Sequence, residues 1–224
     1  MGVGPDGRTR TILSHPFYQN KMLLGALFRA ELAYELLERL GLALSRERTW
    51  FEVDGVPHAL AREESTRRRE VEAELGRLGL ETATAAQYAT LKTRRVREIV
   101  PCRDELFEKW KTVARKHGLD EQAIRSLLAQ QRPPKAEDVL PKATNEALKE
   151  LTKEHSHFSE ADLLRALAEA PSSLGVRVDA LCAHTKKVLT WSPDIVSLGT
   201  RNGETRYTTK RMIRLEERFV SKVC

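Results

Sequence analysis

The sequence is poor in the features that define several classes of protein. It holds only three cysteines, Cys102, Cys182 and Cys224, in 224 residues, and their wide spacing provides neither a disulfide framework nor a zinc-ligand pattern. Its 12 glycines and 6% aromatic residues argue against an all-β fold, which needs many turns and packed rings. The longest apolar run, residues 22–28, is far shorter than the roughly 20 residues of a bilayer span. We therefore expect a mainly helical protein of the cytoplasm that does not contact membranes.

Familiar catalytic and cofactor motifs are also missing. The sequence has no GxxxxGK[ST] phosphate loop, no GxGxxG, no CxxC and no GxSxG, the patterns expected of nucleotide, dinucleotide, redox and serine-hydrolase sites. The N-terminus lacks the apolar segment of a signal peptide. The sequence thus predicts no cofactor and no nucleotide hydrolysis.

What the sequence does have is an excess of positive charge, with a formal net charge of +6. Such a chain attracts polyanions, and repeated cations along one face suit the phosphates of a nucleic acid. The candidate DNA-binding residues are Lys21, Arg29, Arg67, Arg68, Lys92, Arg94, Arg95, Arg201, Arg206, Lys210 and Arg211. For the cluster at 67–69 the alternative is a solvated face neutralised by nearby glutamates, and both interpretations stay open. Fewer acids flank the C-terminal cluster, which favours phosphate binding there.

Apolar periodicity predicts helices along most of the chain. The clearest spans residues 21–40, and Gly41 supplies its C-terminal stop. Its apolar stripe is formed by residues that recur at i and i+4, which are Leu24, Phe28, Leu32, Leu36 and Leu40. Further helices are expected at 58–78, 83–98, 103–117, 120–131, 177–189 and 210–221, and a short strand at 50–53.

The second half of the chain carries two strong local signals. Ser159 and Asp162 are spaced as a capping box, with Phe158 and Leu163 placed as a hydrophobic staple, so a helix should start at 159. Asn-Gly at 202–203 lies between alternating segments and predicts a hairpin. Helix, helix, hairpin and helix together are compatible with a small winged-helix module.

The proline-rich segment 132–142 is the expected domain boundary. Its three prolines and mixed charges are typical of an extended linker. We therefore expect two regions, 1–131 and 143–224, on either side of it. The predicted fold class is mainly α with small β elements.

Two groups of residues raise the question of catalysis. His155 and His157 have the H-x-H spacing that can hold a divalent metal, but no third ligand lies at an obvious spacing, and exposed loop histidines are the favoured interpretation. Tyr18 lies near Lys21 and could in principle act as a nucleophile; packing of its ring at a helix start is favoured instead. The sequence therefore predicts neither a catalytic nor a metal-binding residue.

Several segments, in collinear order, resemble one protein family. KMLLGALFRAEL, beginning at Lys21, is similar to the K-x-x-x-G-A-L-Y-R-A-E-L segment of TrwC-type conjugative relaxases, with Phe28 in the tyrosine position. PDGRTRTIL precedes it as in that family, and ESTRRREVEAEL, TATAAQYATLKTRRVRE and LFEKWKTVARKHGLD follow in the family's order. LTKEHSHFSEADLLRALAE and VSLGTRNGETRYTTKRMIRLEERFV resemble the stretch that opens the helicase-linked region. The resemblance covers nearly the whole chain and implies the helical C-terminal half of a relaxase at 1–131.

The resemblance also implies what this sequence does not contain. In that family a tyrosine near the far N-terminus attacks one DNA strand, a histidine cluster holds the divalent metal, and a PDG turn follows shortly after. Here PDG stands at residues 5–7, so the family's tyrosine and histidines would precede Met1. Tyr18, His155 and His157 fall at the wrong places in that order. We expect this chain alone to be unable to nick DNA.

Three functions therefore compete. The first is a truncated relaxase relative that binds DNA, in single-stranded form, without cutting it. The second is an interaction subunit that complements a separately encoded catalytic relaxase half or a helicase. In that case Leu24, Phe28, Leu32 and Leu36 would be partly exposed in isolation. The third is a winged-helix module that reads a groove with the helix at 177–189, which offers only three cations and no Asn or Gln for base edges.

Overall fold

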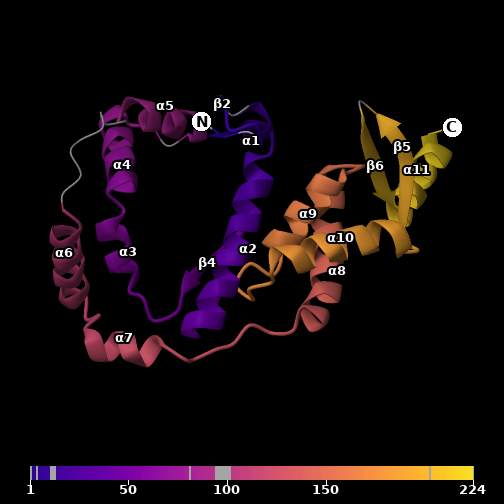
Figure 1. Ribbon diagram of the computed structural model, residues 1–224. Coiled ribbons are helices and arrows are strands. Elements are labelled where there is room, and N and C mark those ends of the chain that lie inside the picture. The colour runs from indigo at the N-terminus through magenta and orange to yellow at the C-terminus, as the bar shows by residue number, and fades with distance from the viewer. Residues whose placement is uncertain are drawn as a thin grey trace. The chain divides into compact units, whose positions relative to one another are not determined.

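The computed structural model describes residues 2–3, 5–10, 14–80, 82–93, 102–201 and 203–223. Within these ranges the chain forms eleven α-helices and three two-stranded antiparallel sheets (Figure 1). The predicted fold class, mainly α with small β elements, is confirmed. In the same ranges, none of the helices is both long and apolar enough to cross a bilayer.

The order of the elements follows most of the expected segments. Along the chain they are β1 (Gly2–Val3), β2 (Thr9–Arg10), α1 (His15–Gln19), α2 (Lys21–Leu40), β3 (Leu44–Glu47), β4 (Trp50–Val53), α3 (His58–Glu64), α4 (Thr66–Leu78), α5 (Ala83–Lys92), α6 (Arg103–Lys116), α7 (Glu121–Leu127), α8 (Ala136–Glu154), α9 (Glu160–Glu169), α10 (Val178–Trp191), β5 (Ile195–Arg201), β6 (Glu204–Thr209) and α11 (Lys210–Val223).

The chain divides into two compact units. Unit 1 comprises Met1–Val53 and Ala129–Cys224, and unit 2 comprises Asp54–Leu128. Unit 1 therefore draws on both ends of the chain, and unit 2 is inserted between its two segments. Neither boundary falls within 132–142, and the expected extended linker is helical from Ala136 onward. Pro141 lies inside α8, where its missing N–H costs one backbone hydrogen bond but does not end the helix.

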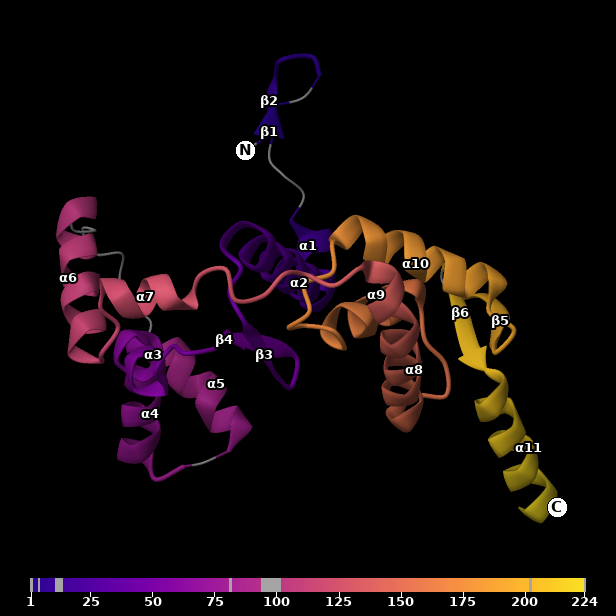
Figure 2. The ribbon, with the colours of Figure 1, turned by 90° about the horizontal axis from the view of Figure 1, so that it is seen from below.

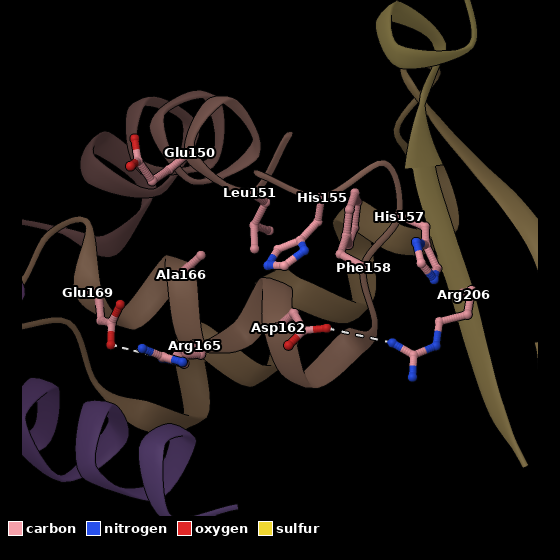
Figure 3. A pocket seen from close by; sticks show the side chains of 10 residues that line it. All are labelled: Glu150, Leu151, His155, His157, Phe158, Asp162, Arg165, Ala166, Glu169 and Arg206. Atoms are coloured by element: carbon pink, nitrogen blue, oxygen red, sulfur yellow. Dashed lines mark hydrogen bonds and ion pairs between the residues drawn. The ribbon is translucent and has the colours of Figure 1, made fainter. Parts of the chain in front are cut away.

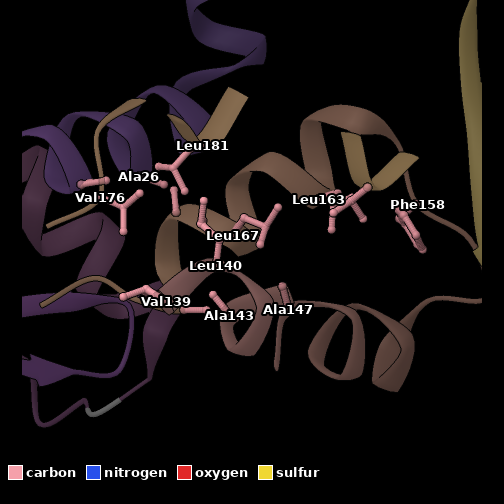
Figure 4. Close-up of a cluster of buried hydrophobic side chains, with 14 residues drawn as sticks. Ala26, Val139, Leu140, Ala143, Ala147, Phe158, Leu163, Leu167, Val176 and Leu181 are labelled. Atoms are coloured by element: carbon pink, nitrogen blue, oxygen red, sulfur yellow. The ribbon is translucent and has the colours of Figure 1, made fainter. Parts of the chain in front are cut away.

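Unit 1 is built around the apolar faces of α2, α8, α9 and α10. Leu163 and Leu167 of α9 and Leu181 of α10 are fully buried, and Val139, Leu140, Ala143 and Ala147 cover them from α8 (Figure 4). Fourteen buried residues belong to this one cluster. The module expected at 143–224 therefore shares its core with α2, a helix more than 100 residues earlier in the chain.

The buried face of α2 consists mainly of alanines. The residues that pack inward are Ala26, Ala30, Ala33 and Leu37, whereas Leu24, Phe28, Leu32 and Leu40 are exposed. The apolar stripe that marks this helix in the sequence is therefore not its buried face. Alanine has no side chain beyond Cβ, so this face lets α2 approach α9 closely, which larger side chains would prevent.

The chain segment before α10 also packs on α2. Gly175 has φ +63°, and a Cβ built there would lie 2.6 Å from Leu37 Cδ1 and 2.8 Å from Tyr34 Cα. The backbone N–H of Val178 donates to the Glu31 carboxylate over 2.8 Å, and the Arg177 guanidinium lies over the Tyr34 ring, 5.5 Å from its centroid. These contacts fix the start of α10 against α2 (Figure 1).

The second segment of unit 1 has the order of a winged-helix module. α8 is followed by Phe158, which pairs antiparallel with Tyr207 of β6, then by α9, α10 and the β5–β6 hairpin. The capping box is confirmed, since Ser159 accepts from the Asp162 N–H and the Asp162 carboxylate accepts from the Ser159 N–H. Its staple residues Phe158 and Leu163 are both buried. α11 extends beyond the hairpin (Figure 2).

One histidine in this unit should make stability depend on pH. A hydrogen bond of 2.8 Å joins His184 Nε2 of α10 to Thr144 Oγ1 of α8, and burial, followed by the nearby Lys187, lowers the pKa of His184 from its ordinary value of 6.5. Because the pKa of His184 is lower in the folded chain, the unfolded chain takes up the imidazole proton more readily as the pH falls below about 6.5. The free energy of unfolding should therefore decrease as the pH drops. We expect urea unfolding to show this loss between pH 7.5 and 5.5. His184→Gln should show a smaller loss, and an equal loss in both proteins would contradict the assignment.

Unit 2 consists of α3 to α7. The single helix expected over 58–78 breaks at Ser65 into α3 and α4, because the polar stretch around the break offers no continuous face to bury. Glu63 of α3 reaches α6, where His117 Nε2 lies at 2.6 Å and Lys116 Nζ at 2.9 Å. Hydrogen bonds from these two side chains lower the pKa of Glu63. The helix expected at 83–98 is observed as α5 to Lys92, and 94–98 lie outside the described residues.

Candidate nucleic-acid interface

The candidate cations of unit 2 that the structure describes are paired with groups within the protein. The Arg67 guanidinium donates to the backbone oxygens of Thr90 and Thr93 at the end of α5. Arg68 Nε pairs with Glu72 at 2.8 Å, and Lys92 Nζ pairs with Glu74 at 2.8 Å. Hydrogen bonds from Arg77 and Lys92 lower the pKa of Glu74 to about 2, so this carboxylate stays charged and keeps both cations engaged.

The remaining candidate cations differ in whether they make ion pairs. Arg94 and Arg95 lie outside the described residues. Arg29 pairs with Glu169 at 3.7 Å and donates to the Thr49 oxygen, and Arg206 pairs with Glu204 at 2.7 Å. The other four candidates, Lys21, Arg201, Lys210 and Arg211, are exposed and make no ion pair within the described part of the chain.

A hollow between α8 and α11 gathers cations that the sequence analysis missed. It has a volume of about 220 Å³ and is lined by Lys149, Thr152, Lys153, Thr209, Arg211, Met212 and Leu215. Lys153 pairs with Glu150 at 2.5 Å, while Lys149 and Arg211 make no ion pair with any described residue. The four-residue spacing of Lys149 and Lys153 could have signalled a basic helix face, had residues 143–154 been predicted as helix.

A larger pocket lies between α8, α9 and β6 (Figure 3). It measures about 420 Å³, and His155, His157 and Arg206 contribute to its lining together with three carboxylates. Arg206 Nη1 lies 3.9 Å from the Asp162 carboxylate, and Arg165 Nε pairs with Glu169 at 3.0 Å. Because carboxylates offset its cations, this pocket is a poor site for a phosphate.

The structure also locates the residues considered for catalysis. His155 and His157 are exposed, and the described residues include no group of three or more His, Cys, Asp or Glu side chains that could hold a metal ion. Tyr18 lies on α1 with 72% of its surface exposed, so the expectation that its ring packs at a helix start is wrong. Its phenol is free of the core but has no metal-ligand set beside it in the part of the chain that is described.

The solvent-facing side of α10 changes character along the helix. Its first turn carries the acidic Asp179 and is fixed against α2 through Val178 and Arg177. Its last two turns expose Lys186, Lys187 and Trp191. An aromatic residue at the end of an apolar helix gives no sequence signal of exposure, and Trp191 was therefore not among the predicted residues.

Fold and site together define a basic, mainly helical protein with small β elements. Residues 2–117 match the family model of the TrwC relaxase, which is just over half of the 224 residues. The chain belongs to the TrwC relaxase family, so its function is related to that of conjugative relaxases, and membership of this family implies DNA binding. No curated protein and no solved structure gives a match.

Proposed function

We propose that this chain is a relaxase relative that binds single-stranded DNA and does not itself cut it. The observation that carries the proposal is the difference in ion pairing among the candidate DNA-binding cations that the structure describes. Arg68 and Lys92 of unit 2 are paired with glutamates, whereas unit 1 exposes a set of cations that pair with no described residue. They include Lys21, Lys149, Lys186, Lys187, Arg201, Lys210 and Arg211.

A polyanion is the natural partner of such a set. Each cation that contacts a phosphate releases a counterion, so affinity for DNA falls with salt, with a slope near −0.7 per contact on single strands. Five contacts would lower the affinity about 100-fold between 50 and 200 mM salt. We also propose that residues 143–224 correspond to the helicase-linked region of relaxases, which they resemble in sequence.

Fluorescence anisotropy with a labelled single strand across a salt series tests DNA binding. We expect Lys149→Ala combined with Arg211→Ala to reduce the salt slope by about 1.4. Arg68→Ala combined with Lys111→Ala is the matched control, because it removes two cations that are paired with Glu72 and Glu108. Absent binding, or binding independent of salt, would overturn the proposal, and an equal effect of both double variants would remove its assignment to unit 1.

The second half of the proposal is the lack of strand cleavage. It is supported by the placement of Tyr18 on exposed α1 and by the absence of a metal-ligand group among the described residues. Transesterification needs nucleophile, metal and phosphate in one site. Supercoiled plasmid incubated with magnesium or manganese should remain supercoiled. Open circles that appear with this chain and vanish with Tyr18→Phe would refute the proposal.

The alternative function, an interaction subunit for a separately encoded catalytic half or a helicase, has one observation in its favour. The apolar stripe of α2 is exposed, with Phe28 at 68% and Leu24 at 42%, as that hypothesis requires. Exposed apolar stripes of this kind mark protein contacts. Sedimentation at increasing concentration should then show association, which Phe28→Glu abolishes; a monomer at all concentrations would weigh against it.

A further inference from the structure

The outer face of α10 presents one large aromatic ring to solvent. Trp191 is 78% exposed, the highest fraction among the large hydrophobic side chains that the structure describes. No other large apolar residue of α10 is exposed, so the ring is not part of an apolar helix face of the kind that another protein would cover.

Cations flank this ring on its own helix. Lys187 lies one turn before Trp191 and Lys186 precedes it, and both are exposed and pair with no described residue. From Ala180 to Trp191 the helix has no acidic residue, and the nearest acid along the chain is Asp194. An exposed aromatic face next to unpaired cations is complementary to a nucleic acid, whose bases stack and whose phosphates are anionic.

The other end of α10 argues for a single strand over a duplex. Helix-turn-helix proteins insert the N-terminal part of the recognition helix into the major groove. Here that end is held by α2, through the hydrogen bond from the Val178 N–H to Glu31 and the contact of Arg177 with Tyr34. α2 therefore blocks entry of this end into a groove, while the end that carries Trp191 remains open.

We propose that Trp191 is a base-stacking platform for single-stranded nucleic acid, with Lys186 and Lys187 binding the adjacent phosphates. This proposal rests on the DNA-binding function proposed above and names one of its contacts. A base unstacked from its neighbours lies on the indole face, and the backbone passes the two ammonium groups of the preceding turn.

The full chain provides a direct optical test, because its three tryptophans are Trp50, Trp110 and Trp191. In the Trp50→Phe, Trp110→Phe double variant, Trp191 is the only indole. Oligo(dT) should quench its emission in a saturable manner, with the same Kd that anisotropy reports, and a duplex of equal length should quench it less. Binding by anisotropy without any change in this emission would overturn the stacking proposal and leave the DNA-binding function intact. Failure to bind at all would defeat both.

Affinity measurements separate stacking from electrostatics. Trp191→Ala should weaken oligo(dT) binding about 5- to 150-fold, the range of one base–aromatic stack, with the salt slope and the thermal midpoint unchanged. Trp191→Phe should retain most of the affinity. Lys186→Ala combined with Lys187→Ala should instead reduce the salt slope. Binding by Trp191→Ala within twofold of the parent chain would overturn the proposal.

Discussion

Gly175→Ala is expected to destabilise unit 1 by about 2–5 kcal/mol. The substitution carries two penalties. A left-handed φ of +63° is unfavourable for a residue with a Cβ. The new Cβ would also lie 2.8 Å from Tyr34 Cα and 2.9 Å from Tyr34 N, and backbone atoms inside a helix cannot move aside as a flexible side chain does. The segment before α10 would have to separate from α2.

Gly203→Ala is the matched control for this change. Gly203 also has a left-handed φ, +78°, but nothing lies within 4 Å of a Cβ built there. Its cost should be limited to the backbone penalty of about 1–2 kcal/mol. Denaturant unfolding should be followed in a Trp110→Phe background, where the remaining tryptophans report on unit 1. Equal destabilisation by the two alanines would show that the contact with α2 contributes nothing.

A fragment of residues 132–224 is expected to lack a fixed core. It contains α8 to α11 and the β5–β6 hairpin but not α2, so the faces that Ala26 and Ala30 cover in the intact chain become exposed. Glu31, which accepts the Val178 N–H, is missing as well. We expect helical far-ultraviolet dichroism, weak near-ultraviolet dichroism and binding of a hydrophobic dye, the signature of lost specific packing.

Removal of unit 2 should, in contrast, leave unit 1 folded. The Ala129 N–H donates to the Leu40 oxygen over 2.9 Å, and Val53 pairs in register with Leu44. A Gly/Ser linker of about six residues, reaching roughly 20 Å, can therefore replace 54–128. This shortened chain should unfold cooperatively, and a fragment of 132–224 with an equally sharp transition would contradict the shared core.

Local signals predicted much of the fold. The capping box at Ser159, the pairing of β5 with β6 and the glycine stop after Leu40 follow from signals within a few residues, and each is found as predicted, although Asn202 itself lies outside the described residues. The inward face of α2 could not be predicted in this way. Periodicity favours the largest apolar stripe, but a close helix–helix contact selects the smallest side chains, and only the position of α9 determines which face that is.

The candidate site was also only partly predictable, because the sequence shows where the cations are but not which groups pair with them. Charge along the sequence made both Arg67 and Arg211 candidates, yet Arg67 donates to the end of α5, while Arg211 lines the hollow between α8 and α11 and makes no ion pair with a described residue. Whether a cation is free depends on which carbonyl or carboxylate the fold brings near it. Trp191, in contrast, was not a candidate from the sequence. Its ring is exposed because α10 ends at the edge of the core, which also depends on the fold.

The construction of unit 1 from both ends of the chain has a consequence for biosynthesis. α9 is completed about 130 residues after α2, a delay of about 6–26 s at 5–20 residues per second. Throughout that interval the alanine face of α2 is not yet covered by α9, and the exposed leucine stripe adds to the apolar surface of the nascent helix. Unit 2 is complete at residue 128 and can fold first. The nascent chain therefore carries an apolar helix that must be kept from aggregating until its partner is made.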